Sequence, residues 1–175
     1  MKKIIALLLA ALLTVSAGVC ALAEPVTLTD QVGREVTVEE VPSRIVSGYY
    51  ISTSALIALG VQDRIVGIEA KAAKRPIYAC SAPELIALPN VGSAKEFNLE
   101  GCIALKPDLV ILPKKLKDAA ATLSELGIPV LLVNPESQEN LEDMIALLGE
   151  ATGTGVPPVR KPASATVPKM PPSLL

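Results

Sequence analysis

The fold of this chain is constrained most by four short apolar segments that alternate with amphipathic stretches of helical periodicity. The apolar segments are residues 44–47, 65–68, 109–112 and 130–133. Strands that are continuously apolar are typical of a parallel sheet covered by helices on both faces. We therefore predict an α/β fold, a Rossmann-like three-layer sandwich with a mostly parallel sheet and right-handed crossovers.

The stretches between these strands carry the signals of helices. Apolar residues recur at helical spacing over residues 116–126 and 141–148. Residues 52–59 form a further predicted helix that Gly60 ends, and Asn98 is a good N-cap for another. A capping box at residues 81–84 predicts a short helix before Pro89.

Two other segments complete the predicted lobe. Apolar and polar residues alternate over residues 26–38 on either side of Gly33, which predicts a β-hairpin that precedes the sheet. Lysine and arginine gather over residues 71–75 after the second apolar strand, where we expect a basic loop.

Charge and composition divide the chain into three parts. Its 175 residues are 50% apolar with a net charge of −2, which excludes intrinsic disorder and a dedicated nucleic-acid binder. Residues 24–153 hold 11 Lys and Arg against 18 Asp and Glu. Residues 154–175 hold three basic residues, six prolines and no acid. We interpret this last part as a Pro-rich, disordered tail produced by an out-of-frame ending; a solvated native tail is the alternative.

Residues 1–23 have the pattern of a secretory signal peptide. Lys2 and Lys3 precede an apolar run over residues 4–13, and small residues lead to a cleavage site after Ala23. The run is shorter than the roughly 20 residues that a membrane span needs. Lipid attachment at Cys20 is the alternative to cleavage, but Val19 is bulky for such a site. We expect export to the periplasmic or extracellular side of the cell membrane.

Cys80 and Cys102 remain after the predicted cleavage. In an exported chain this pair can form a disulfide. The alternative is two independent buried thiols, because Cys102 occupies an apolar position of the helix after Asn98. Without histidine, the chain offers too few ligands for a zinc site, so no metal is expected.

The candidate site lies in the loops that follow the strands, because ligands of open parallel sheets bind outside the carboxyl ends of the strands. These loops carry hydroxyls, two phenols and five cations, which suit an anionic or oxygen-rich ligand. Polarity that merely reflects contact with water is the alternative. The predicted ligand-binding residues are Tyr49, Tyr50, Ser52, Thr53, Lys71, Lys74 and Arg75.

The sequence carries no familiar catalytic motif. It lacks histidine, a G-x-S-x-G elbow and a phosphate loop, and its G-x-G at residues 153–155 follows a predicted helix rather than a strand. We therefore expect a chain that is not an enzyme and has no cofactor. A small exported Rossmann-like enzyme remains an alternative function.

Several segments, by their order and spacing, resemble class III ABC-transporter substrate-binding proteins, the binders of iron–siderophores, haem and vitamin B12. The most specific is residues 98–111, which is similar to the family motif N-L-E-x-I-x-x-L-x-P-D-L-V-I. The other resembling segments are residues 26–30, 33–36, 42–46, 58–67 and 126–130.

The resemblance implies two α/β lobes joined by a long helix, with a ligand held between them and delivered to an ABC permease. Because it covers residues 26–153, we expect the N-terminal lobe only, with the second lobe absent. The implied ligand is a metal chelate or corrinoid, either a ferric siderophore or cobalamin, and the chain is expected to be a monomer. Glu100 matches an acid that pairs with permease arginines; a carboxylate that favours the helix dipole is the alternative.

A single lobe would supply only one side of the ligand cleft. We therefore expect a truncated solute-binding protein that binds weakly or is inactive alone. A non-functional fragment of a disrupted gene is a further alternative.

Overall fold

The computed structural model describes residues 25–155. The predicted signal peptide and the predicted tail from residue 156 onward lie outside the described residues. Within residues 25–155, no helix is long and apolar enough to cross a membrane.

Four parallel strands form the central sheet, in the order β4-β3-β5-β6. Each predicted strand is confirmed to within one residue at its ends, because continuous apolar runs of this length leave little choice of boundary. The strands are β3 (Ile45–Ser47), β4 (Ile65–Ile68), β5 (Leu109–Pro113) and β6 (Val130–Val133).

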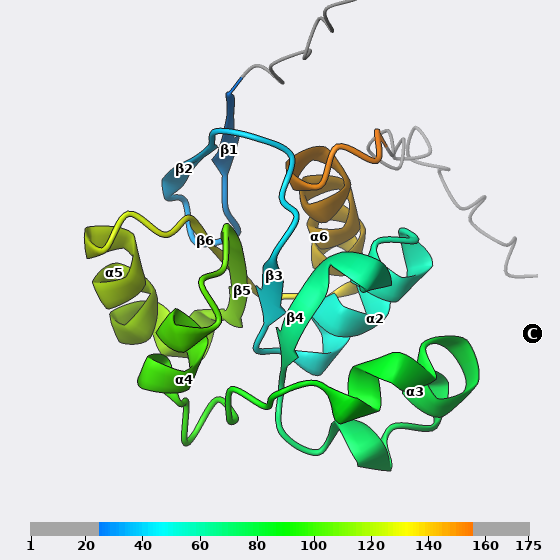
Figure 1. Ribbon diagram of the computed structural model, residues 1–175. Coiled ribbons are helices and arrows are strands. Elements are labelled where there is room, and N and C mark those ends of the chain that lie inside the picture. Colours follow the sequence, from blue (N-terminus) through cyan, green and yellow to red (C-terminus); the bar gives the residue numbers. More distant parts are fainter. Residues whose placement is uncertain (1–24, 156–175) are drawn as a thin grey trace, which may run out of the picture.

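Helices cover both faces of this sheet (Figure 1). Strand residues alternate between the two faces: Ile111 and Leu131 pack into one core, whereas Val110 and Leu132 pack into the other. The predicted three-layer α/β sandwich is therefore confirmed. One face carries α2 (Tyr50–Ala58) and α6 (Gln138–Ala151), and the other carries α4 (Leu99–Ala104) and α5 (Lys117–Glu125).

The predicted hairpin consists of the antiparallel strands β1 (Val26–Thr29) and β2 (Glu35–Val38). Its turn contains Gly33 at a φ of 84°, a backbone conformation that glycine adopts without strain. The buried carboxylate of Asp30 accepts hydrogen bonds from the backbone N–H groups of Arg34 (2.9 Å) and Leu132 (3.2 Å). Gln31 N–H also donates to Leu132 O at 3.1 Å, so the turn covers the edge strand β6.

The motif of residues 98–111 has a structural role at both ends. Asn98 caps α4 by accepting a 2.8 Å hydrogen bond from Gly101 N–H. Asp108 accepts hydrogen bonds from the backbone N–H groups of Ser43 and Arg44, each at 2.8 Å. These contacts hold the start of β3 beside the start of β5, which explains why the two resembling segments occur together.

Residues 71–88 differ from the prediction. The expected basic loop contains a short 3-10 helix and leads into α3 (Pro76–Ser81). The capping box is wrong, because Ser81 ends α3 and no side chain caps the turn after it, but the short helix expected before Pro89 is present as a 3-10 helix at Pro83–Ala87. Pro76 favours a helix start through its fixed φ, and the fully buried Tyr78 anchors α3 to the core. Within residues 25–155, the 3-10 helices are Gln62–Arg64, Ala72–Lys74, Pro83–Ala87 and Lys114–Leu116.

Both cysteines of the described region are free thiols, so of the two alternatives left open by the sequence the disulfide is wrong. Cys80 is exposed on α3, whereas Cys102 lies on α4 and its side chain is fully buried in the core. The alternative of two buried thiols holds for Cys102 alone. Burial raises the pKa of the Cys102 thiol to about 11.

Thiol alkylation is expected to separate the two cysteines. At about pH 8, a pKa near 11 leaves roughly one thiol in a thousand as the reactive thiolate. Iodoacetamide should therefore modify Cys80 in the native chain and Cys102 only in denaturant, as read by peptide mass mapping. Equal labelling of both cysteines without denaturant, or a Cys80–Cys102 cross-link in the unreduced map, would contradict this expectation.

Candidate functional site

The candidate site lies where the loops after β3 and β5 diverge. The chain leaves β3 for α2 on one face of the sheet and leaves β5 for α5 on the other face. Since β3 and β5 are neighbours, their carboxyl ends form the switch point at which open α/β sheets bind ligands. The loops after the strands, where the sequence predicts the ligand site, thus include this switch point between β3 and β5.

Gly48 brings the loop after β3 close to β5. Its N–H donates a 2.9 Å hydrogen bond to Ile111 O, and a Cβ atom at this position would lie 2.6 Å from Leu112 Cδ2. Leu112 is fully buried, so it has little room to move away. Gly48 therefore permits the close approach that sets Tyr49 and Tyr50 at the end of β3.

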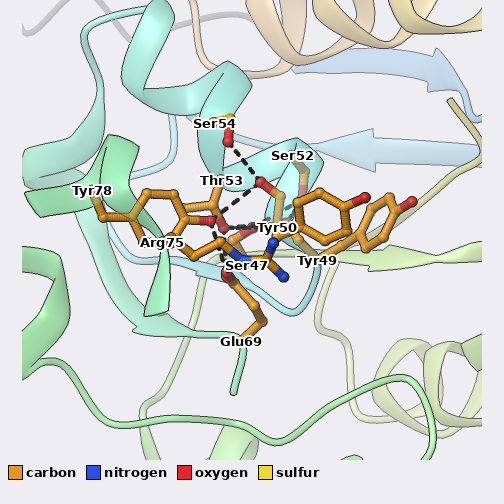
Figure 2. Close-up of polar contacts among 9 residues, drawn as sticks. All are labelled: Ser47, Tyr49, Tyr50, Ser52, Thr53, Ser54, Glu69, Arg75 and Tyr78. Atoms are coloured by element: carbon orange, nitrogen blue, oxygen red, sulfur yellow. Dashed lines mark hydrogen bonds and ion pairs between the residues drawn. The ribbon is translucent and has the colours of Figure 1, made fainter. Parts of the chain in front are cut away.

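The two tyrosines and Arg75 form one contact group, although they come from two strand ends (Figure 2). The rings of Tyr49 and Tyr50 meet edge to face, with centroids 5.1 Å apart and planes at 69°. The guanidinium carbon of Arg75 lies 3.9 Å from the Tyr50 ring centroid, within cation–π range. The structure thus brings together three of the predicted ligand-binding residues.

A buried carboxylate lies beside this group. Glu69, directly after β4, is only 4% exposed. Thr53 donates to its Oε2 at 2.8 Å and Tyr78 donates to its Oε1 at 2.7 Å, as Figure 2 shows. Burial, reinforced by the hydrogen bond and charge of Glu69, raises the pKa of the Tyr78 phenol far above its usual value. Tyr78 is therefore a neutral hydrogen-bond donor at physiological pH.

Direct ligand contact is contradicted for two of the predicted residues, Ser52 and Thr53, because both are fully buried. They occupy the first turn of α2, where the Ser52 hydroxyl donates to Tyr49 O at 2.7 Å. Both hydroxyls also lie within 2.9 Å of Ser47 Oγ. These residues order the loop after β3 and, through Thr53, hold Glu69.

Lys71 and Lys74 are exposed on the segment that leads to Arg75, and Lys71 adopts a left-handed backbone with a φ of 71°. On the opposite side of the switch point, Lys114 and Glu136 form a 2.9 Å ion pair across the loops after β5 and β6. The hydrogen bond from Lys114 lowers the pKa of Glu136.

Tyr49 is half-buried at the switch point. Its pKa is raised first by burial and then by the neighbouring Tyr50 and the Glu136 carboxylate.

Glu100, the predicted permease contact, is exposed in the first turn of α4. Because α4 precedes β5, this first turn lies toward the same edge of the sheet as the loops after the strands.

The strand-end cluster also contains residues that the sequence prediction missed. We define this cluster as Ser47, Tyr49, Tyr50, Ser52, Thr53, Glu69, Arg75 and Tyr78. Glu69 had a usable signal, since an acid directly follows a short apolar strand. Tyr78 was missed because its helix was missed, and Pro76 was the signal that could have revealed that helix.

A groove of about 520 Å³ lies elsewhere on the lobe, between β1 and α6. It shares no residue with the strand-end cluster, so it is a separate feature of the surface. Its lining consists of Thr27, Leu28, Thr29, Asp143, Ala146, Leu147, Glu150 and Gly155.

The exposed part of the strand-end cluster suits an anionic ligand. A guanidinium stacked on one ring keeps its planar set of N–H donors in a fixed orientation, which matches carboxylate-like oxygens. Lys71 and Lys74 add positive charge on the adjoining segment. Tyr50 is 39% exposed, so part of this residue can contact the same ligand.

Comparisons with known proteins agree on one family. The sequence model described as "Periplasmic binding protein" matches residues 45–155. The uncharacterized ABC transporter substrate-binding lipoprotein YvrC of Bacillus subtilis is 34% identical over 134 residues, covering 74% of this chain and 40% of that protein. The molybdate-binding protein MolA of Haemophilus influenzae is 30% identical over 140 residues, covering 78% and 39% respectively.

A solved structure agrees with these relatives. The crystal structure of a periplasmic solute binding protein from Veillonella parvula matches with a TM-score of 0.68 at 29% identity. The match covers 75% of this chain and 42% of that chain. The chain thus spans about two fifths of the length of the relatives it matches.

Proposed function

This chain belongs to the periplasmic binding protein family, and we propose that it forms the N-terminal lobe of the extracytoplasmic solute-binding component of an ABC importer. The family consists of binding proteins rather than enzymes. The alternative of a small exported enzyme is therefore set aside. Export directed by residues 1–23 to the periplasmic or extracellular side of the membrane is part of this proposal.

The proposed ligand is a metal chelate or corrinoid, either a ferric siderophore or cobalamin, and of these the site favours an anionic ferric siderophore. The observation that carries this proposal is the Arg75 guanidinium held 3.9 Å above the Tyr50 ring, at the carboxyl ends of the strands. Such a group binds anionic oxygens with fixed geometry. The name of the relative MolA supports an oxyanion, because molybdate is one.

The proposed partner is an ABC permease at the membrane surface. We propose that the chain binds this permease as a monomer. Glu100 is the proposed contact, because it is exposed in the first turn of α4 and free to meet a basic group. The resemblance of residues 98–111 to the family motif implies an acid at this position that pairs with permease arginines. A role for Glu100 in favouring the helix dipole is compatible with the same position.

We further propose that the lobe of residues 24–153 binds its ligand weakly by itself. Well-formed pockets bury about 70–90% of a small ligand, and one lobe covers a ligand from one side only. Compared with a two-lobed cleft, a single lobe makes roughly half of the contacts with the ligand. The ligand nevertheless loses nearly the same translational and rotational entropy on binding. A loss of about 4 kcal/mol turns a nanomolar site into a micromolar one.

Calorimetric titration of the chain with ferric siderophores, cobalamin and molybdate tests this proposal. We expect dissociation constants in the micromolar range or weaker, and tighter binding for anionic chelates than for an uncharged ligand of similar size. Submicromolar affinity would contradict the single-lobe part of the proposal. A preference for the uncharged ligand would contradict the anionic part.

A further inference from the structure

Glu69 is a buried charge whose role the proposed function leaves open. A buried carboxylate is costly unless hydrogen bonds and an opposite charge stabilise it. Thr53 and Tyr78 each donate to one of its oxygens, but both donors are neutral. The opposite charge is Arg75, whose Nε lies 3.8 Å from Glu69 Oε1.

The guanidinium of Arg75 is oriented by this arrangement. Its Nε is buried and has no hydrogen-bond acceptor among the described residues, whereas 34% of the side chain is exposed. The inner edge of the guanidinium is therefore turned toward Glu69, while Tyr50 fixes its plane from one face. Two independent contacts thus restrict a side chain that would otherwise sample many rotamers.

The carboxylate itself is fixed from two further elements. Thr53 lies on α2 and Tyr78 lies on α3, and together they occupy both oxygens of Glu69. The Tyr78 hydroxyl oxygen also lies 3.2 Å from Tyr50 O, which places α3 beside the residue on which Arg75 stacks. The contacts drawn in Figure 2 thus hold Glu69 in place, and Glu69 in turn lies beside Arg75.

We infer that Glu69 is a positioning residue: its carboxylate holds Arg75 against Tyr50 and thereby presents the guanidinium to an anionic ligand. This inference rests on the proposed function for the identity of the ligand class. The inference predicts the direction in which anion affinity changes when the Glu69 charge is removed. A negative charge beside the site should, by electrostatics alone, repel an anion. If positioning outweighs repulsion, removal of the charge weakens anion binding; if repulsion dominates, removal strengthens it.

A measurement without ligand tests the positioning directly. In the full chain, the Arg75 Nε–H resonance, assigned by its loss in Arg75→Lys, should exchange slowly with water. We expect Glu69→Gln, which keeps the size of the side chain, to accelerate this exchange by about tenfold or more as Arg75 is released. The matched control is Glu84→Gln, which removes the same charge from an exposed position and should leave the exchange rate unchanged. An unchanged rate in Glu69→Gln would overturn the inference.

A second variant covers the case in which Glu69→Gln does not fold. Tyr78→Phe removes one donor and keeps the carboxylate charge, so we expect an exchange rate between those of the wild-type chain and a released arginine. A rate equal to that of the wild type in Tyr78→Phe would show that fixation of Glu69 does not matter for Arg75 and would contradict the inference.

The ligand arm uses sodium molybdate and a ferric tricatecholate siderophore as probes. We expect Glu69→Gln to bind whichever probe the wild-type chain binds about tenfold more weakly, and Glu84→Gln to bind it as the wild type does. Tighter binding by Glu69→Gln would overturn the inference. If neither probe binds the wild-type chain, the proposed ligand class fails, while the exchange measurement still decides whether Glu69 positions Arg75.

Discussion

Replacing Arg75 with glutamine is expected to weaken the binding of an anionic chelate by about 10- to 100-fold. The reason is that glutamine removes the charge that faces the ligand and the stack on Tyr50. Hydrogen bonds to charged groups contribute about 1.5–3 kcal/mol each, which corresponds to that range of affinity. Titration calorimetry of the wild-type and variant chains measures the effect.

Two variants separate the role of Arg75 from that of net charge. Lys106→Gln removes one positive charge at an exposed residue before β5, at the opposite edge of the sheet, and should leave the affinity unchanged. Arg75→Lys keeps the charge but loses the planar donor set, so it should recover only part of the affinity. Equal losses in Arg75→Gln and Lys106→Gln would show that only long-range charge matters.

The largest expected effect on stability comes from Asp30→Ala. The Asp30 side chain is fully buried and forms a 2.8 Å ion pair with Arg34. It also accepts hydrogen bonds from the backbone N–H groups of Val32, Arg34 and Leu132. Removing one partner of a buried pair costs about 3–5 kcal/mol, because the remaining groups lose their acceptor. We expect Asp30→Ala to lower the free energy of unfolding by about 3 kcal/mol, the lower end of this range, because the Arg34 side chain is 32% exposed and water stabilises its charge.

Urea denaturation measures the free energy of unfolding of this variant, and Glu39→Ala is the control at an exposed position after β2. Hydrogen exchange adds a local test. Protection of the Gln31 and Leu132 amides should fall in Asp30→Ala by more than protection of the β3 amides, since the hairpin turn is released from β6. A loss below about 1 kcal/mol would contradict this role of Asp30.

The central sheet was predictable because its signals are local. A run such as residues 130–133, apolar at every position, must be buried on both faces, and burial on both faces requires helices on each side. The N-cap of α4 at Asn98 was predictable for the same reason, since the cap residue and its helix lie within one turn.

Residues 71–88 were predicted poorly because their structure depends on distant contacts. Tyr78 is fully buried, and its hydroxyl reaches Glu69, nine residues earlier, and Tyr50, twenty-eight residues earlier. No local periodicity signals such a contact. The capping pattern at residues 81–84 was overridden in the same way, since α3 already uses Ser81 as its last residue.

Three of the predicted ligand-binding residues meet in the structure, whereas two others are buried. The rule that ligands bind at the carboxyl ends of parallel strands assigned Tyr49, Tyr50 and Arg75 to one edge of the sheet, and they contact one another at that edge. It could not tell which hydroxyls face the protein interior, so Ser52 and Thr53 were assigned to the ligand although both are buried. Burial of a single side chain is a property of the packed structure.

The central claim is that the strand-end surface of this lobe binds an anionic ligand. A two-dimensional NMR titration of the ¹⁵N-labelled chain tests it most directly, with molybdate and a gallium(III) tricatecholate siderophore complex as anions and cobalamin as the ligand without net negative charge, each added to about 2 mM, where even weak binding is visible. We predict that at least one of the two anions shifts the amide resonances of residues 48–50 and 71–75. Shifts confined to the groove between β1 and α6, shifts with cobalamin alone, or no shift with either anion would contradict the claim.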